Sequence, residues 1–232
     1  SGGRIRGGDG AHLDPDVLAE AYPRAEGWRP VLGQTGAAQG HLRNQGVTAG
    51  DLFLFFGVFR HAELWRRRWR FVPGTRPFHA LWGWLHIGEV VPVDEMSEQD
   101  LPWARYHPHL HGQPDPGNTL YLASDGLKMP GVSQDVAGAG AFTQLDAPKV
   151  LSDPEGRLPT QWRLPAAFYP GEDRPPLSYH TKADRWRLDA PWCYLQCAAR
   201  GQEFVLDLAA YPELNPWLAS LLRTDHDDRR LP

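Results

Sequence analysis

Cysteine and long apolar runs are both scarce in this sequence. Cys193 and Cys197 are the only cysteines among 232 residues, which is too few for a disulfide framework and favours a reducing compartment such as the cytoplasm. We expect both to be small buried residues. No apolar run approaches the roughly 18–20 residues of a membrane span, and the first residues show no signal-peptide pattern. The sequence therefore argues against a disulfide-stabilised secreted domain and against a membrane partner.

Lysine is also nearly missing. Lys128, Lys149 and Lys182 are the only lysines, so 21 of the 24 Lys and Arg residues are arginine. Guanidinium groups are planar and suit phosphates and base edges. The formal net charge of −4 argues against a protein that coats nucleic acid over its whole surface. Any nucleic-acid contact is therefore expected at a local basic patch.

Glycine, proline and tryptophan are abundant, with 24, 22 and 10 residues. Short apolar runs between many Gly and Pro residues indicate strands, turns and irregular loops. Four stretches read as strands: "GDLFLFFGVFR", "FHALWGWLHIGEVVPVD", "NTLYLAS" and "GQEFVLDLA". Gly83 and Gly88 in the second stretch are expected to be bulges or points of close approach.

Helices are predicted to be few and short. "HLDPDVLAEAY" reads as a helix with Asp14 as its N-cap, and "NPWLASLLR" as one that begins at Asn215 and buries Leu218, Leu221 and Leu222. "GWRPVLGQTGAAQGHLRNQG" has too many glycines for regular structure. The prediction is one α+β domain over residues 1–232, built on a mixed or antiparallel curved sheet with long Gly/Pro-rich loops.

The stretch "YHPHLHGQPDPGNTLY" places His107, His109 and His111 at alternate positions. Pro108 favours extended backbone before it, which would put the three rings on one side. Such rings can chelate zinc or iron, with Asp14, Asp16 or Glu203 as a further ligand. However, no Cys or Glu follows at a ligand spacing, and a polar loop with satisfied rings would look the same. We therefore predict no metal site.

Polar residues inside apolar strands are the second signal. His86 and Glu89 interrupt "GWLHIGEVV", and a buried polar group needs either partners or a functional role. Gln202 and Glu203 open the predicted last strand directly after Gly201, where a ligand could approach closely. A strand with one solvated face is the alternative for His86 and Glu89. The sequence shows no phosphate-binding glycine loop, dinucleotide fingerprint or serine elbow, and so it assigns no cofactor.

The stretch "RHAELWRRRWR" interleaves arginines with tryptophans. The basic and aromatic residues concerned are Arg60, Trp65, Arg66, Arg67, Arg68, Trp69 and Arg70. Guanidinium groups neutralise phosphates and indole faces stack on bases, so this pattern suits single-stranded or flipped nucleotides. A charged hairpin edge that discourages aggregation would look much the same.

Several stretches together resemble the nucleotide modification associated domain family, third type. They are "AHLDPD", "GQTGAAQGHL", "GDLFLFFGVFR", "LWGWLHIGEVV", "HPHLHG", "NTLYLAS", "WRLPAAF" and "RGQEFVLD", in order from about Ala11 to Trp217. The resemblance implies bacterial or phage systems that handle hypermodified DNA bases, and it fixes no reaction. Because "SGG" resembles the end of a Ser/Gly-rich turn in that family, we expect a strand to precede it. The chain also resembles, more weakly, PUA-like barrels such as EVE and ASCH domains, which bind single modified bases.

The resulting hypothesis is a protein that binds a nucleotide or modified base and whose enzymatic status the sequence leaves open. Its implied partners are a nucleotide or DNA carrying a modified base, and other proteins of a base-modification system. Stacking is assigned to Trp65, Trp82 or Trp84, phosphate contact to Arg60, and polar contacts to His86, Glu89, Asn118, Tyr121 and Gln202. The acid–base pairing predicted is His107 or His109 with Glu203. A metal-dependent hydrolase and a non-catalytic reader of modified DNA are the alternatives.

Overall fold

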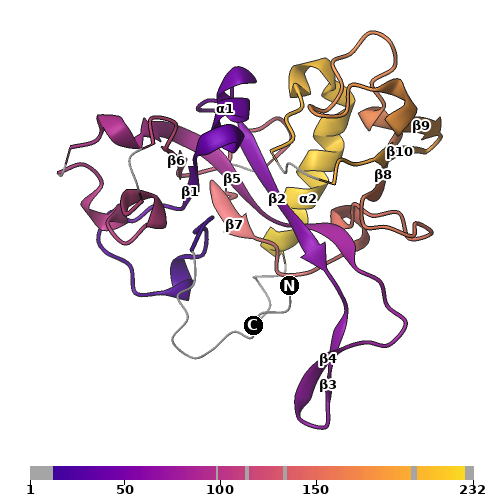
Figure 1. The fold of residues 1–232 in the computed structure, drawn as a ribbon, viewed down its shortest axis with the longest axis horizontal. Coiled ribbons are helices and arrows are strands. Elements are labelled where there is room, and N and C mark those ends of the chain that lie inside the picture. The colour runs from indigo at the N-terminus through magenta and orange to yellow at the C-terminus, as the bar shows by residue number, and fades with distance from the viewer. Residues whose placement is uncertain (1–12, 98, 113–114, 133–134, 200–202, 228–232) are drawn as a thin grey trace.

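A computed structural model of the protein describes residues 13–97, 99–112, 115–132, 135–199 and 203–227 (Figure 1). The strands of the described residues are β1 (Val31–Gln34), β2 (Leu52–Phe59), β3 (Ala62–Trp65), β4 (Arg68–Phe71), β5 (Phe78–Pro92), β6 (Thr119–Ala123), β7 (Ala139–Ala141), β8 (Gln161–Pro165), β9 (Trp186–Asp189) and β10 (Trp192–Gln196). The α-helices are α1 (Gly36–Asn44) and α2 (Asn215–Asp227), and short 3-10 turns connect many of the elements. The predicted α+β class is confirmed.

The central sheet is antiparallel and is organised around the long strand β5. The strand order is β1-β6-β5-β2, and β7 also pairs with β5. β2 and β7 flank the first half of β5, while β6 pairs with its second half. Within the described residues the sheet stays open, with β1 at one edge and β2 at the other, so it does not close into the barrel that the PUA-like comparison implied.

Two glycines let β5 change partners along its length. Gly88 is the extra residue where β5 shifts register against β6, between Ile87 and Glu89, and a side chain on it would meet the Ser124 backbone at 2.8 Å. Gly83 lies beside a second register shift, and a side chain there would meet the Gly140 carbonyl oxygen at 2.7 Å. Both positions behave as the sequence predicted.

A second antiparallel sheet, β8-β10-β9, packs with α2 on one side of the central sheet (Figure 1). The shared core includes Trp84, Trp162, Cys193, Cys197 and the apolar face of α2, with Leu218, Leu221 and Leu222 all buried as predicted. Burial raises the pKa of both cysteine thiols to about 12.

Helix α1 corrects the expectation that its glycine-rich stretch is irregular. Gly46, with φ +75°, ends it: the Gly46 N–H donates to the Arg43 carbonyl and the Val47 N–H to the Leu42 carbonyl. That pattern is a Schellman motif, which satisfies the last carbonyls of a helix. At the other end Asp115 accepts from the Thr35 hydroxyl and from the Gly36 N–H, and a carboxylate there stabilises a helix start.

Two further expectations are wrong. The segment after Leu13 forms no α-helix among its described residues, and only the 3-10 turn η1 (Ala19–Ala21) interrupts it. Asp16 instead pairs with Val31 as an isolated β-bridge. Residues 203–207 were predicted to be a strand, but no regular element covers them, and among the described residues they belong to no sheet. They run beside the open edge of β2, where the candidate site lies.

Candidate functional site

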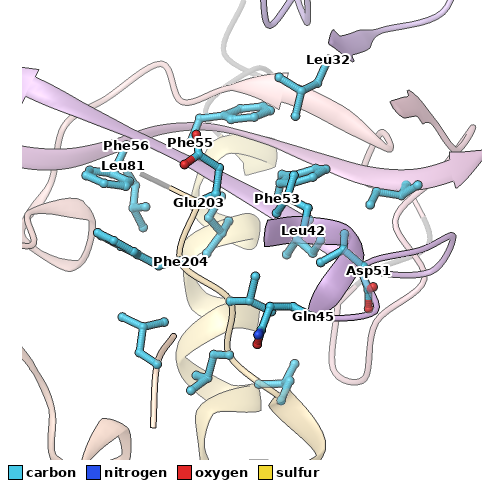
Figure 2. Close-up of a pocket in the computed structure, with 18 of the residues that line it drawn as sticks. Leu32, Leu42, Gln45, Asp51, Phe53, Phe55, Phe56, Leu81, Glu203 and Phe204 are labelled. Carbon is cyan, nitrogen blue, oxygen red and sulfur yellow. The ribbon is translucent and has the colours of Figure 1, made fainter. Parts of the chain in front are cut away.

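A cavity of about 1140 Å³ follows the open edge of β2. Because β2 is an edge strand, residues from both of its faces reach the cavity: Phe53 and Phe55 on one side, and Leu54 and Phe56 on the other. Figure 2 shows Glu203 and Phe204 facing these rings from the neighbouring segment, and Leu42 of α1 and Gln45 directly after it also line the cavity. The volume exceeds the roughly 300–1,000 Å³ typical of small-molecule sites.

Asp14 supplies a carboxylate to the wall of this cavity. Its Oδ1 accepts a hydrogen bond of 2.8 Å from the Gly33 N–H of β1. Its Oδ2 lies 3.1 Å from Nε2 of His109, and its Oδ1 lies 3.7 Å from Nε2 of His107. Asp14 is therefore not the helix cap that the sequence predicted. It contacts both β1 and residues 107–111, which we call the histidine loop.

Gly33 makes the contact between Asp14 and His109 possible. A side chain on Gly33 would approach the His109 ring at 2.3–2.7 Å, far inside contact distance. With glycine there, the His109 ring lies directly against β1 and reaches the carboxylate. The glycine in "VLGQ" thus has a packing reason that concerns the site itself.

Asn118 fixes the protonation of His109. The Asn118 side-chain NH₂ donates to the His109 carbonyl oxygen at 2.7 Å, so its Oδ1 faces the ring and accepts from Nδ1 at 2.6 Å. The other ring nitrogen, Nε2, faces the Asp14 carboxylate, which also accepts. With both nitrogens donating, His109 is an imidazolium. Its pKa is raised, chiefly by the hydrogen bond to Asp14.

The same contacts act on Asp14 in the opposite direction. Burial alone would raise the pKa of its carboxyl, but the His107 and His109 rings and the Gly33 N–H outweigh burial and lower that pKa to about 2. Asp14 and His109 therefore form an ion pair with only 7% and 11% of their side-chain surfaces exposed.

His107 lies behind this pair and is fully buried. Its Nδ1 accepts a long hydrogen bond of 3.4 Å from the His109 N–H, which leaves the proton on Nε2. Among the residues that the structure describes, that Nε2 makes no hydrogen bond, and it lies 3.7 Å from Oδ1 of Asp14. An unpaired buried polar atom is uncommon, and here it adds a dipole that favours the charged carboxylate.

The histidine loop is not extended, which corrects the expected side-by-side arrangement of three rings. Residues Pro108–Leu110 form a 3-10 turn, so His107 and His109 converge on Asp14 while His111 turns away to the Arg105 carbonyl. In the part of the chain that the structure describes, no group of three or more His, Cys, Asp or Glu side chains is arranged to hold a metal ion.

The residues of β5 and β6 that were predicted to contact a substrate, apart from Trp82, do not line the cavity. Trp84 and Tyr121 are core residues whose polar atoms donate to Ala137 and Gln39. His86 is buried and bonds to the Ser124 hydroxyl at 2.6 Å, and Glu89 is exposed and pairs with Arg29. Their neighbour Trp82 is the tryptophan of β5 that lines the cavity, stacked on Phe55 at 5.2 Å.

Other predicted residues divide between the cavity and a remote hairpin. Glu203 lines the cavity with His109, Asn118 orients His109, and Gln202 lies outside the described residues. Arg60 is exposed, with its guanidinium 4.7 Å from the Phe71 ring. The Arg/Trp residues Trp65, Arg66, Arg67, Arg68, Trp69 and Arg70 all belong to the β3–β4 hairpin.

The fold and the site together describe an α+β protein with a buried carboxylate–imidazolium pair on the wall of an aromatic cavity. The chain belongs to the family described as nucleotide modification associated domain 3, whose model matches residues 1–207. That membership associates the protein with nucleotide modification systems. Searches of curated proteins and of solved structures give no match. Neither α1 nor the described length of α2 is long and apolar enough to cross a bilayer.

Proposed function

We propose that the protein binds a nucleotide or modified base in the cavity along β2 and performs acid–base chemistry on it, as part of a DNA base modification system. The observation that carries the proposal is the Asp14–His109 ion pair on the wall of that cavity. Perturbed, mutually paired ionisable groups in a cleft are a recognised sign of a functional site. The family supports the nucleotide context.

The cavity walls suit a flat heterocycle. Phe55 and Trp82 form a stacked pair on the lining, and Phe53 and Phe56 add two further rings to it. Aromatic walls that leave room for another ring bind extruded or single bases by stacking, while a few polar groups read the base edge. Asp14, His109 and Glu203 are the ionisable groups at hand for that reading.

The protonation states assign different roles to the pair. His109 carries a proton on Nε2 that a substrate nitrogen or oxygen could accept in place of Asp14, which makes His109 the acid. Asp14 is ionised, but with a pKa of about 2 it is a weak base, so its role is to hold the imidazolium in place. Glu203 provides a second carboxyl on the cavity lining and is assigned the base, so the predicted His109–Glu203 pairing is kept, with Asp14 as a third group in this proposal. His107 positions Asp14 and does not line the cavity.

A thermal-shift screen with canonical and modified mononucleotides tests the binding step. A ligand at 100 times its Kd stabilises the folded state by about 2.7 kcal/mol, which is easily seen as a rise in Tm. We expect such a shift for one nucleotide class with the wild type, and its loss in Phe55→Leu. Phe59→Leu, on the same strand but outside the cavity, is the matched control and should keep the shift.

Chemistry is tested by product analysis with whichever nucleotide binds. His109→Ala should abolish turnover, while His111→Ala, which changes a histidine of the same loop that faces away, should retain it. Binding in the cavity with no product from the wild type would remove the acid–base role and leave a non-catalytic reader. Equal turnover by both histidine variants would also remove it.

A further inference from the structure

The β3–β4 hairpin projects from the body of the molecule beyond the end of β2 (Figure 1). Its register places Leu64 opposite Trp69, and Ala62 opposite Phe71, so these side chains share one face. Leu64, Trp69 and Phe71 are 62%, 75% and 59% exposed. An isolated two-stranded hairpin is marginally stable in water, and one that exposes large apolar side chains on this scale indicates an interaction surface.

Charge gives that surface a preferred partner. Residues 60–71 contain five arginines and one glutamate, a formal charge of +4 in a chain whose total is −4, so all other residues together carry −8. Glu63 pairs with Arg70 at 2.6 Å. The remaining arginines of the segment, Arg60 and Arg66–Arg68, give the hairpin a local positive field that the rest of the molecule does not share.

The turn at the tip places arginine where glycine would be expected. Arg66 and Arg67 both have positive φ, +47° and +65°, in a two-residue hairpin turn. Asn-Gly is the favoured pair for such turns, because other residues are strained at these angles. Two arginines at these angles make the turn less stable than Asn-Gly would, and backbone strain of this kind is typical of functional positions.

We propose that the β3–β4 hairpin binds a single-stranded nucleic-acid segment. Arg66 and Arg67 at the turn and Arg60 beside the Phe71 ring contact phosphates, and Trp69 stacks on a base. Charge complementarity selects this occupant, since exposed aromatic residues beside clustered arginines match a polyanion with stacked rings. The inference goes beyond the nucleotide-binding cavity and does not depend on it. Phe56, which lines the cavity, and Phe59, at the end of β2, are about 10 Å apart along the strand, so one polymer could contact both places.

The strained turn offers a sharp test by fluorescence anisotropy with a labelled single-stranded oligonucleotide. The double variant Arg66→Asn, Arg67→Gly removes two charges and installs the preferred turn. We expect its Tm to stay level or rise while its affinity falls at least tenfold. The slope of log K against log salt should flatten by about 1.4, since each lost phosphate contact contributes about 0.7 for single strands. Lys128→Gln with Lys182→Gln removes two exposed charges elsewhere and should leave affinity within twofold.

Trp69→Ala tests stacking separately and should weaken binding about tenfold with little change in the salt slope. Duplex DNA of the same sequence should bind more weakly than the single strand. The proposal is overturned if the turn variant binds as tightly as the wild type. It is also overturned if the protein binds anionic phospholipid vesicles but not the oligonucleotide at equal salt. If light scattering shows a dimer that Trp69→Ala converts to a monomer, and no oligonucleotide binds, the face belongs to a contact with a second copy of the chain and the proposal is overturned.

Discussion

At the residue scale, the site depends on groups that are far apart in sequence. His107 and His109 were identifiable from their spacing, and Asp14 was one of three acids considered beside them. Its pairing with His109 and the role of Gly33 were not predicted, because both arise only when β1 packs against the histidine loop. A carboxylate directly before proline at the start of an apolar stretch resembles a helix cap. The signal that could have distinguished it is the glycine of "VLGQ", which sits inside a short apolar strand where a larger residue would be expected.

Gly33→Ala is expected to damage the site and the fold together. The added methyl group would lie 2.3 Å from the His109 ring, so the ring must move and its contact with Asp14 is lost. Overpacking of this kind lowers the free energy of unfolding by about 1–3 kcal/mol. Urea unfolding and the nucleotide thermal shift measure both effects. Gly112→Ala, in open space in the same loop, should change neither; an equal loss in both variants would contradict the packing argument.

The Asp14–His109 pair predicts the direction of two pH effects. His109 has a raised pKa, so its contribution to stability is complete below pH 6.5 and is lost as pH rises through the folded value. Asp14 has a pKa lowered from 3.8 to about 2, so its contribution is complete above pH 3.8 and is lost as pH falls towards 2. The pair is therefore most stabilising between these limits.

Histidine NMR titration checks this directly. His109 should stay protonated above pH 6.5, and Asp14→Asn should lower its pKa, because the dominant hydrogen bond becomes neutral. His79 and His180 serve as internal references, since burial lowers the pKa of each. A His109 pKa that does not respond to Asp14→Asn would show that the two groups are not paired in solution.

At the element scale, local patterns predicted the elements that bury an apolar face and missed those held by single contacts. β2, β5, β6 and α2 follow from apolar runs of the right period and length. α1 was not predicted because its glycines lower helix propensity. The two residues that stabilise its ends are Asp115, which is remote in sequence, and Gly46, which has a positive φ. Residues 203–207 alternate like a strand, but that pattern could not reveal their hydrogen bonds to Ser178. The Val205 N–H donates to the Ser178 hydroxyl oxygen, and the Val205 carbonyl accepts from the Ser178 N–H.

Two glycine substitutions in and after α1 should have opposite effects. Gly40→Ala adds a methyl group in open space within the helix, and is expected to raise the free energy of unfolding by about 0.5–1 kcal/mol. Gly46→Ala forces alanine to a φ of +75°, and is expected to lower it by about 1 kcal/mol. Urea denaturation of the two variants decides: a stabilising Gly46→Ala would show that α1 does not end in the Schellman motif.

At the scale of the whole molecule, the cavity and the connection between the two sheets are the same feature. Phe204 lines the cavity and contacts Phe56 of β2, Trp162 of β8 and His180, at ring-centre distances of 5.8, 6.0 and 4.7 Å. The segment 203–207 therefore forms one wall of the cavity and joins the central sheet to the β8-β10-β9 sheet. A ligand in the cavity would contact the same junction, so binding and global stability should be coupled.

Phe204→Ala tests that coupling. Loss of a fully buried Phe ring costs about 3–5 kcal/mol, and for this partly buried ring we expect about 2 kcal/mol in urea unfolding. The nucleotide thermal shift should shrink as well, because the ring is also a wall of the cavity. Phe71→Ala, at an exposed position of the hairpin, is the control and should change stability by about 0.5 kcal/mol or less. If the two variants are equally stable, the segment does not hold the sheets together. If Phe204→Ala is destabilised yet keeps the full ligand shift, the ligand does not contact this wall of the cavity.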